Sequence, residues 1–171
     1  CKLIHVQEGR YYGHPGIHAS ATPWDESIPE SPPAVWLPHR EIGRSNSQPL
    51  FMDDGIFKGQ ILAADVTYAG IQRYFLEKVQ GEYQGVIFQF SGGLEAGMNT
   101  LQKGPDGALY TGGIGCGDMA DWGWQGRRWG LQKLAPNGTV AFEMLAVRSL
   151  ADGFSIEFTK PYSQAALQAA N

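Results

Sequence analysis

The stretch Gly104-Pro-Asp-Gly-Ala-Leu-Tyr110 decides the fold class of this chain. Pro105 fixes φ at a turn, the Asp106 side chain can bond its own backbone, and Gly107 supplies positive φ without strain. The apolar run that follows the turn is typical of a β-strand. The stretch therefore predicts a chain reversal followed by a strand, as in an all-β protein.

A second turn of the same kind occurs at Ala135-Pro-Asn-Gly-Thr-Val140, with the apolar runs 129–134 and 140–147 on its two sides. Two such turns predict repeated hairpins. Hairpins repeated at this spacing indicate a β-propeller, whose blades take about 40 to 50 residues each. With 171 residues the chain holds two to three blades of four-stranded antiparallel sheet, so we expect a partial propeller.

The composition fits a globular β protein. Hydrophobic residues make up 43% and charged residues 18% of the chain, and 23 Gly and 10 Pro mark a structure rich in turns. The net charge of −4 argues against nucleic acid as a partner, since the tight basic pair Arg127-Arg128 is no phosphate-binding face. No apolar run approaches the roughly 18 residues of a membrane span.

The chain divides into three parts. Residues 1–55 form a loop-rich segment broken by proline, residues 56–161 are strand-rich, and residues 162–171 form a short tail of helix-forming composition. The chain opens in strand-like Lys2-Leu-Ile-His-Val6, so we expect its native N-terminus to lie upstream. The other expected strands are 60–66, 71–79, 83–90, 108–112, 129–134, 139–147 and 154–158.

The two cysteines, Cys1 and Cys116, lie in no metal-binding or catalytic motif. Nothing in their spacing shows whether they form a disulfide.

Four runs of sequence resemble the glucose/sorbosone dehydrogenase family: Pro38–Ser45, Phe57–Asp65, Ile71–Tyr74 and Gly104–Tyr110. The segments 2–6, 9–15 and 153–161 are similar to a secreted subgroup of these proteins in environmental bacteria. The resemblance implies a six-bladed propeller, in the periplasm or secreted, that holds pyrroloquinoline quinone over calcium and oxidises sugars.

The chain departs from that family at Gly97-Met-Asn-Thr100, where the family carries an Arg-x-Arg-Asp run whose arginines contact the quinone. A quinone with three carboxylates needs charge-assisted partners, and neither Gly nor Asn supplies one. The residues therefore argue against quinone binding even where the fold carries over.

His39 and Arg44 are the candidate catalytic residues, and Trp36 beside them is a candidate substrate-binding residue. A base and a cation together could take a proton from a sugar hydroxyl. The competing interpretation is an ordinary surface histidine and arginine.

A second set of candidates crowds into residues 118–129. Flat indole faces beside carboxylates and guanidinium groups are suited to sugar recognition, because C–H faces stack on indole while hydroxyls bond to polar groups. Tryptophan also packs between propeller blades, and on that ground Trp129 is assigned to the core. The remaining substrate-binding candidates are Asp118, Asp121, Trp122, Trp124 and Arg127.

His14 and His18 stand four residues apart, but Pro15 and Gly16 exclude a helix that would align them. They can chelate a metal from a loop, with His39 as a third ligand. Hydrogen bonding within the loop is the alternative role.

Three functions from different classes follow. The first is a sugar-oxidising propeller domain that acts on or binds carbohydrate, the second a calcium-dependent lactonase, and the third a non-catalytic module that binds carbohydrate or another partner. Because a partial propeller leaves sheet edges exposed, we expect a homo-oligomer or a part of a larger chain.

Overall fold

The computed structural model describes residues 1–13, 29–38, 41–114 and 128–163. In these ranges the regular secondary structure consists of β-strands and contains no helix, so the all-β prediction is confirmed there. The described part accordingly has no helix long and apolar enough to cross a membrane. The strands are β1 (Lys2–Leu3), β2 (Val35–Trp36), β3 (Asn46–Phe51), β4 (Ile61–Asp65), β5 (Gly70–Val79), β6 (Glu82–Ser91), β7 (Gly97–Lys103), β8 (Leu109–Ile114), β9 (Trp129–Leu134), β10 (Met144–Leu150) and β11 (Gly153–Phe158).

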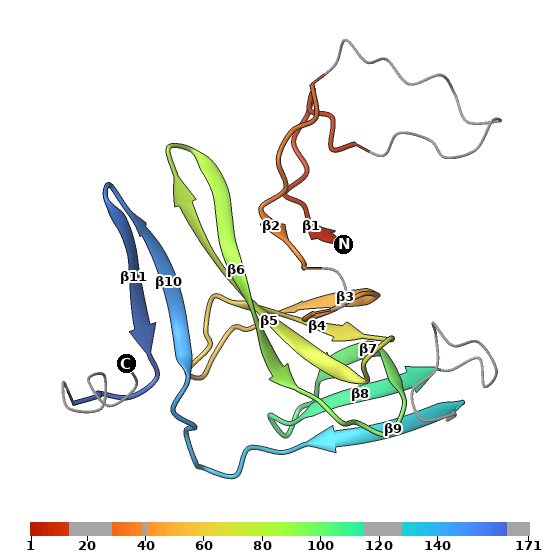
Figure 1. Ribbon diagram of the computed structural model, residues 1–171. Coiled ribbons are helices and arrows are strands. Elements are labelled where there is room, and N and C mark those ends of the chain that lie inside the picture. Colours follow the sequence, from red (N-terminus) through yellow and green to blue (C-terminus); the bar gives the residue numbers. More distant parts are fainter. Residues whose placement is uncertain (14–28, 39–40, 115–127, 164–171) are drawn as a thin grey trace, which may run out of the picture.

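The strands form several antiparallel sheets, none of which closes into a barrel. The largest is a meander in the order β3-β4-β5-β6, and the next is β7-β8-β9. Two sheets of two strands each, β1-β2 and the β10-β11 hairpin, complete the described part. In Figure 1 the β10-β11 hairpin stands beside the long β5-β6 hairpin, on the side away from β7-β9.

The centre of the four-stranded sheet, in β4 and the first half of β5, is buried on both faces. Along β4, Leu62 and Ala64 point to a cluster that includes side chains of β7 and β8, while Ile61 and Ala63 point to a cluster that includes Val35 of β2. This alternation is the period of two that a β-strand imposes. The sheet is therefore the central layer of the described structure.

The turn predicted at 104–107 is confirmed and joins β7 to β8. Gly107 has φ of 76°, and its N–H donates to the Gly104 carbonyl at 3.1 Å. The Asp106 carboxylate accepts the Ala108 N–H at 3.2 Å. The positive φ is the conformation that only glycine adopts without strain.

Asp106 also ties this turn to its neighbours. Its carboxylate pairs with Lys133 of β9 at 2.7 Å and accepts the Tyr110 hydroxyl at 2.9 Å. Lys133, then Tyr110 and the Ala108 N–H, lower the pKa of Asp106 to about 2. The turn thus holds three strands in register.

The prediction of a second hairpin is wrong, although its turn forms. Gly138 has φ of 76° and Asn137 accepts the Thr139 N–H at 2.9 Å. However, β9 pairs with β8, and β10 pairs with β11. The strand expected at 139–147 begins only at Met144, where the chain meets the β5-β6 hairpin.

The loop-rich segment 1–55 contains two strands that the sequence did not predict, β2 and β3. The longer is β3, which includes Pro49. β3 lies at the edge of its sheet, and its register shifts between Ser47 and Pro49, where Gln48 has φ of 37°. Edge strands and bulges are the places where a sheet tolerates proline.

A buried arginine joins the β10-β11 hairpin to the central sheet. Arg73 of β5 is fully buried, and its guanidinium carbon lies 4.3 Å from the Phe57 ring centre and 4.5 Å from that of Phe88. The guanidinium donates to the carbonyls of Met144 at 2.6 Å and Leu145 at 3.1 Å. Met144 and Leu145 are the first two residues of β10.

Two further side chains complete this arrangement. Gln60 accepts a hydrogen bond from Arg73 at 2.5 Å and donates to the Leu145 carbonyl at 3.0 Å. Glu143 lies 3.5 Å from the guanidinium. Burial lowers the pKa of Arg73 and Glu143 raises it again, and arginine stays protonated in proteins.

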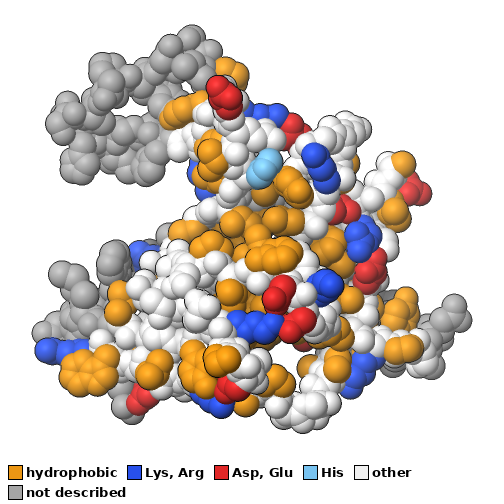
Figure 2. Space-filling model, turned by 180° about the vertical axis from the view of Figure 1, so that it is seen from behind, with side chains coloured by type: hydrophobic (Ala, Val, Ile, Leu, Met, Phe, Trp, Pro, Cys, Tyr) orange, Lys and Arg blue, Asp and Glu red, His pale blue; other side chains and the backbone are white. Residues whose placement is uncertain are grey.

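Trp129 does not lie in the core, so that assignment is wrong. It is 75% exposed, and Leu131 on the same face of β9 is 77% exposed. β9 is the outermost strand of its sheet, and among the described residues no element covers this face. Hydrophobic side chains also gather on the face of the molecule seen in Figure 2.

Replacing Arg73 with alanine should lower the free energy of unfolding by roughly 3 kcal/mol, because buried carbonyls lose their donors. Hydrogen exchange should rise in β10 and β11 more than in β7 and β8. Urea unfolding and exchange mass spectrometry measure both effects.

Arg148→Ala is the matched control, since Arg148 pairs with Glu157 at a partly exposed site of the same hairpin. It should cost less than about 1 kcal/mol. Equal losses for the two variants would contradict the role given to Arg73.

Candidate functional site

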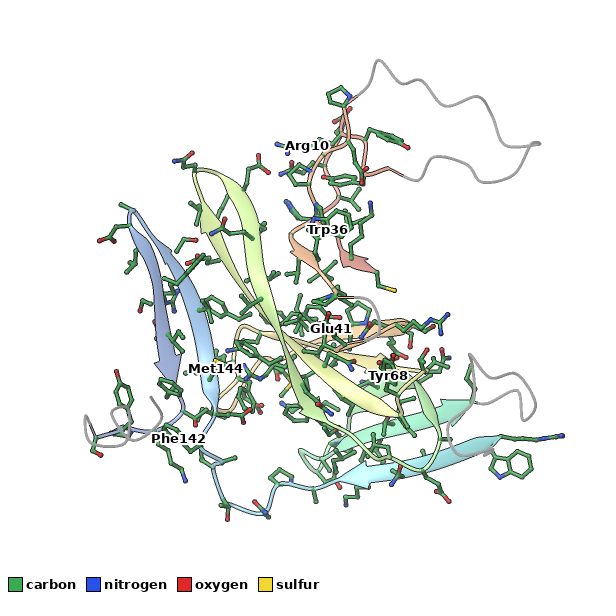
Figure 3. The ribbon with its side chains drawn as sticks, in the orientation of Figure 1. Arg10, Trp36, Glu41, Tyr68, Phe142 and Met144 are labelled. Carbon is green, nitrogen blue, oxygen red and sulfur yellow. The ribbon has the colours of Figure 1, made fainter. Side chains whose placement is uncertain are left out.

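A pocket of about 250 Å³ opens where the end of β6 meets the turn between β4 and β5. Its polar lining consists of Glu41, Tyr68, Gln72, Gln89 and Ser91, and we call it the Gln89 pocket. These residues come from the segment before β3, the β4-β5 turn, β5 and β6. Figure 3 labels Glu41 and Tyr68 at this site.

Gln72 forms a rigid floor. Its side chain is 2% exposed, and Nε2 donates to the Ile42 carbonyl at 2.8 Å and to Asp65 Oδ2 at 3.2 Å. Its Oε1 accepts from Asn46 Nδ2 at 2.7 Å. Both donor hydrogens of the amide are therefore engaged within the protein.

Asp65 holds the Gln72 amide in place. Its carboxylate is fully buried and accepts the Thr67 N–H at 2.9 Å and the Ser45 N–H at 3.4 Å, besides the Gln72 amide. A buried carboxylate with three donors is well compensated. The network joins the segment before β3 to β4 and β5.

The walls of the pocket differ from its floor. The side chains of Glu41, Tyr68, Gln89 and Ser91 make no hydrogen bond or ion pair with one another or with any other residue that the structure describes. Ser91 Oγ is closed to solvent and has no hydrogen-bond partner among the described residues. A buried hydroxyl without a partner costs about 1–3 kcal/mol, so a small movement of the wall that lets a ligand reach it is offset by the new hydrogen bond.

Glycine keeps the pocket open beside these groups. A Cβ on Gly92 would lie 2.6 Å from Gln89 Nε2, and a Cβ on Gly70 would lie 2.6 Å from the Ser91 carbonyl. Any larger residue at these positions would displace the wall. The local sequence thus leaves room for a small ligand next to the free amide.

A second groove, of about 340 Å³, lies between β2, the β5-β6 hairpin and β10-β11. It contains Trp36, the predicted substrate-binding residue, which is 61% exposed, and Phe154, which is 74% exposed. We call it the Trp36 groove. Trp36 does not line the Gln89 pocket, and Figure 3 shows it above Glu41 and Tyr68 in the view.

The polar residues of the Trp36 groove satisfy one another. Glu77 accepts the Ser149 N–H at 2.8 Å and the Gln84 amide at 3.1 Å, and Gln84 also donates to the Ser149 hydroxyl at 2.6 Å. The Ser149 N–H is the main cause that lowers the pKa of Glu77. These contacts fasten β10 to β5 and β6 and leave few groups for a polar ligand.

Arg44 is half-buried in the segment that precedes β3. Its carbonyl accepts the thiol of Cys1 at 2.5 Å, and Arg44 is not among the residues that line the Gln89 pocket. Its predicted partner, His39, lies outside the described residues. So do the other predicted site residues, His14, His18, Asp118, Asp121, Trp122, Trp124 and Arg127, together with Cys116.

The residues at 97–100 do not fit a quinone. They begin β7, where Met98 is fully buried in the core and Gly97 lies so close to Val66 that a Cβ would be 2.1 Å from the Val66 carbonyl. Residues 97–100 themselves carry no cation, and the backbone of Val66 leaves no room beside Gly97. In the described ranges no three His, Cys, Asp or Glu side chains come together as a metal site.

Comparison with protein-family models, with curated proteins and with solved structures found no match for this chain. The evidence for function is therefore the geometry of the Gln89 pocket and the Trp36 groove.

Sequence reasoning missed every polar residue of the Gln89 pocket. The signal that could have found part of it is Ser91-Gly-Gly93, a hydroxyl and two glycines directly after the strand expected at 83–90. Glu41 and Tyr68 line the pocket only because distant segments of the chain come together, so no local sequence pattern marks them.

Proposed function

We propose that the protein binds carbohydrate in the Gln89 pocket. The observation that carries the proposal is the convergence, on one small cavity above a rigid floor, of four polar side chains without a partner among the described residues. A carboxylate accepts hydrogen bonds, while a serine hydroxyl, a tyrosine hydroxyl and an amide both donate and accept. A compound with several neighbouring hydroxyl groups matches this mixture.

The remaining lining also suits a sugar. Tyr68 offers an aromatic ring on which the C–H face of a sugar can pack, and Ile42 adds apolar surface. A volume of about 250 Å³ is below the range of drug-sized ligand pockets and favours one or two sugar rings at most.

We confine the proposal to binding. Sugar oxidation requires an electron acceptor, and residues 97–100 do not fit the quinone. Lactone hydrolysis by the predicted route requires calcium, for which the described residues contain no cluster of ligands. The non-catalytic alternative needs only the groups that the pocket presents.

Titration calorimetry against a panel of monosaccharides and disaccharides tests this function. We expect at least one sugar to bind, and Gln89→Ala and Ser91→Ala to weaken its affinity about threefold to tenfold each, the value of one hydrogen bond. Gln102→Ala, an exposed glutamine on β7, is the matched control and should leave the affinity unchanged.

Trp36→Ala distinguishes the two cavities, because Trp36 lines only the second one. Loss of binding in Trp36→Ala with normal binding in Gln89→Ala would move the site to the Trp36 groove. Absence of binding by every sugar in the panel would refute the function.

We further propose that the sheets are neighbouring blades of a partial propeller. The supporting observations are the consecutive order β3-β4-β5-β6, the following meander β7-β8-β9, and the packing of β3 against β7. In such an arrangement, the exposed face of β9 would contact another blade, from a longer chain or a second copy.

The 171-residue chain should therefore self-associate, and Leu131→Lys should shift it towards the monomer by placing a charge on the exposed face of β9. Size-exclusion chromatography with light scattering measures the mass. Gln102→Lys adds the same charge elsewhere and should not change the mass. A wild-type monomer of 18.7 kDa that is stable to dilution would contradict the propeller.

A further inference from the structure

The Gln89 pocket carries its charge at the rim. Glu41 is its single charged residue among those described, and it is exposed at the rim. The Ser91 hydroxyl, which has no partner among the described residues, is buried. A ligand that fills the pocket therefore meets a carboxylate at the rim and neutral groups further in.

The Glu41 carboxylate is available to a ligand. It forms no ion pair with a described residue. Three of the described lysines pair with other carboxylates instead: Lys2 with Glu30, Lys103 with Asp53, and Lys133 with Asp106. A free carboxylate attracts an ammonium group and repels a second carboxylate.

We infer that the Gln89 pocket selects amino sugars over neutral sugars and disfavours sugar acids, with Glu41 as the residue that determines this specificity. The inference rests on the proposed function and names the substrate class of the same site. An ammonium group carries three donors and no acceptor, which matches a carboxylate that only accepts. The hydroxyls of the sugar are left for Gln89, Ser91 and Tyr68.

The expected size of the effect follows from the exposure of Glu41. Exposed ion pairs are weak and screened by salt, so the preference should be about threefold to fivefold at low ionic strength and should shrink as salt is added. A hydrogen bond without charge would show no such dependence on salt.

Titration calorimetry with glucose, glucosamine, N-acetylglucosamine and glucuronate tests the inference under mildly acidic conditions and low salt. Glucosamine should bind about threefold to fivefold more tightly than glucose, and glucuronate more weakly than glucose. N-acetylglucosamine keeps the nitrogen but loses its charge, so it should gain nothing over glucose from Glu41.

Glu41→Gln keeps the shape and removes the charge, and it should bring glucose, glucosamine and glucuronate to nearly equal affinity. Asp152→Asn removes the same charge at an exposed turn outside the pocket and should preserve the preference. Circular dichroism confirms that each variant keeps the wild-type β spectrum.

Two results would overturn the inference while leaving the proposed function in place: equal affinities for the sugars in the wild type, or a preference that survives in Glu41→Gln. Failure of all four sugars and of the wider panel would instead refute the proposed function itself. The two failures are therefore distinguishable.

Discussion

The buried guanidinium of Arg73 is the interaction on which the position of the β10-β11 hairpin against the central sheet depends. A charge inside a protein is unfavourable unless it is paired and hydrogen-bonded. Here two phenylalanine rings flank it, and Gln60 and the carbonyls of Met144 and Leu145 accept its hydrogen bonds. β10 is consequently held where it can satisfy Arg73, on the central sheet.

The position of β10 in turn shapes the Trp36 groove. Ser149 reaches Glu77 because β10 runs beside β5, and the polar groups there satisfy one another. The Gln89 pocket has the opposite arrangement. Its floor of Gln72 and Asp65 is satisfied internally, and the polar side chains of its walls have no partner in the part of the chain that the structure describes. This contrast separates a structural contact from a site that can bind a polar ligand.

Local sequence patterns predicted the strands that alternate clearly or end in strong turns. The expected runs at 60–66, 71–79 and 83–90 correspond to β4, β5 and β6, and the Pro-Asp-Gly turn joins β7 to β8. β3 was missed because Pro49 argues against a strand until the bulge and the free edge are known. β7 was missed because Gly97 and Asn99 interrupt its apolar pattern.

The pairing of β10 and the pocket could not be predicted for a different reason. Residues 129–147 look like a hairpin locally, but Arg73, far away in sequence, holds Met144 and Leu145. Likewise, Gln89 and Ser91 are ordinary strand residues in the sequence. They become candidates only when Glu41 and Tyr68 are brought beside them, with no partner in the described structure.

A crystal structure of the protein with its best-binding sugar tests whether the polar groups of the Gln89 pocket form a carbohydrate site. We expect a sugar ring in the Gln89 pocket, with hydroxyls within hydrogen-bond distance of Gln89 and Ser91. A sugar bound in the Trp36 groove, with the Gln89 pocket holding only solvent, would contradict it.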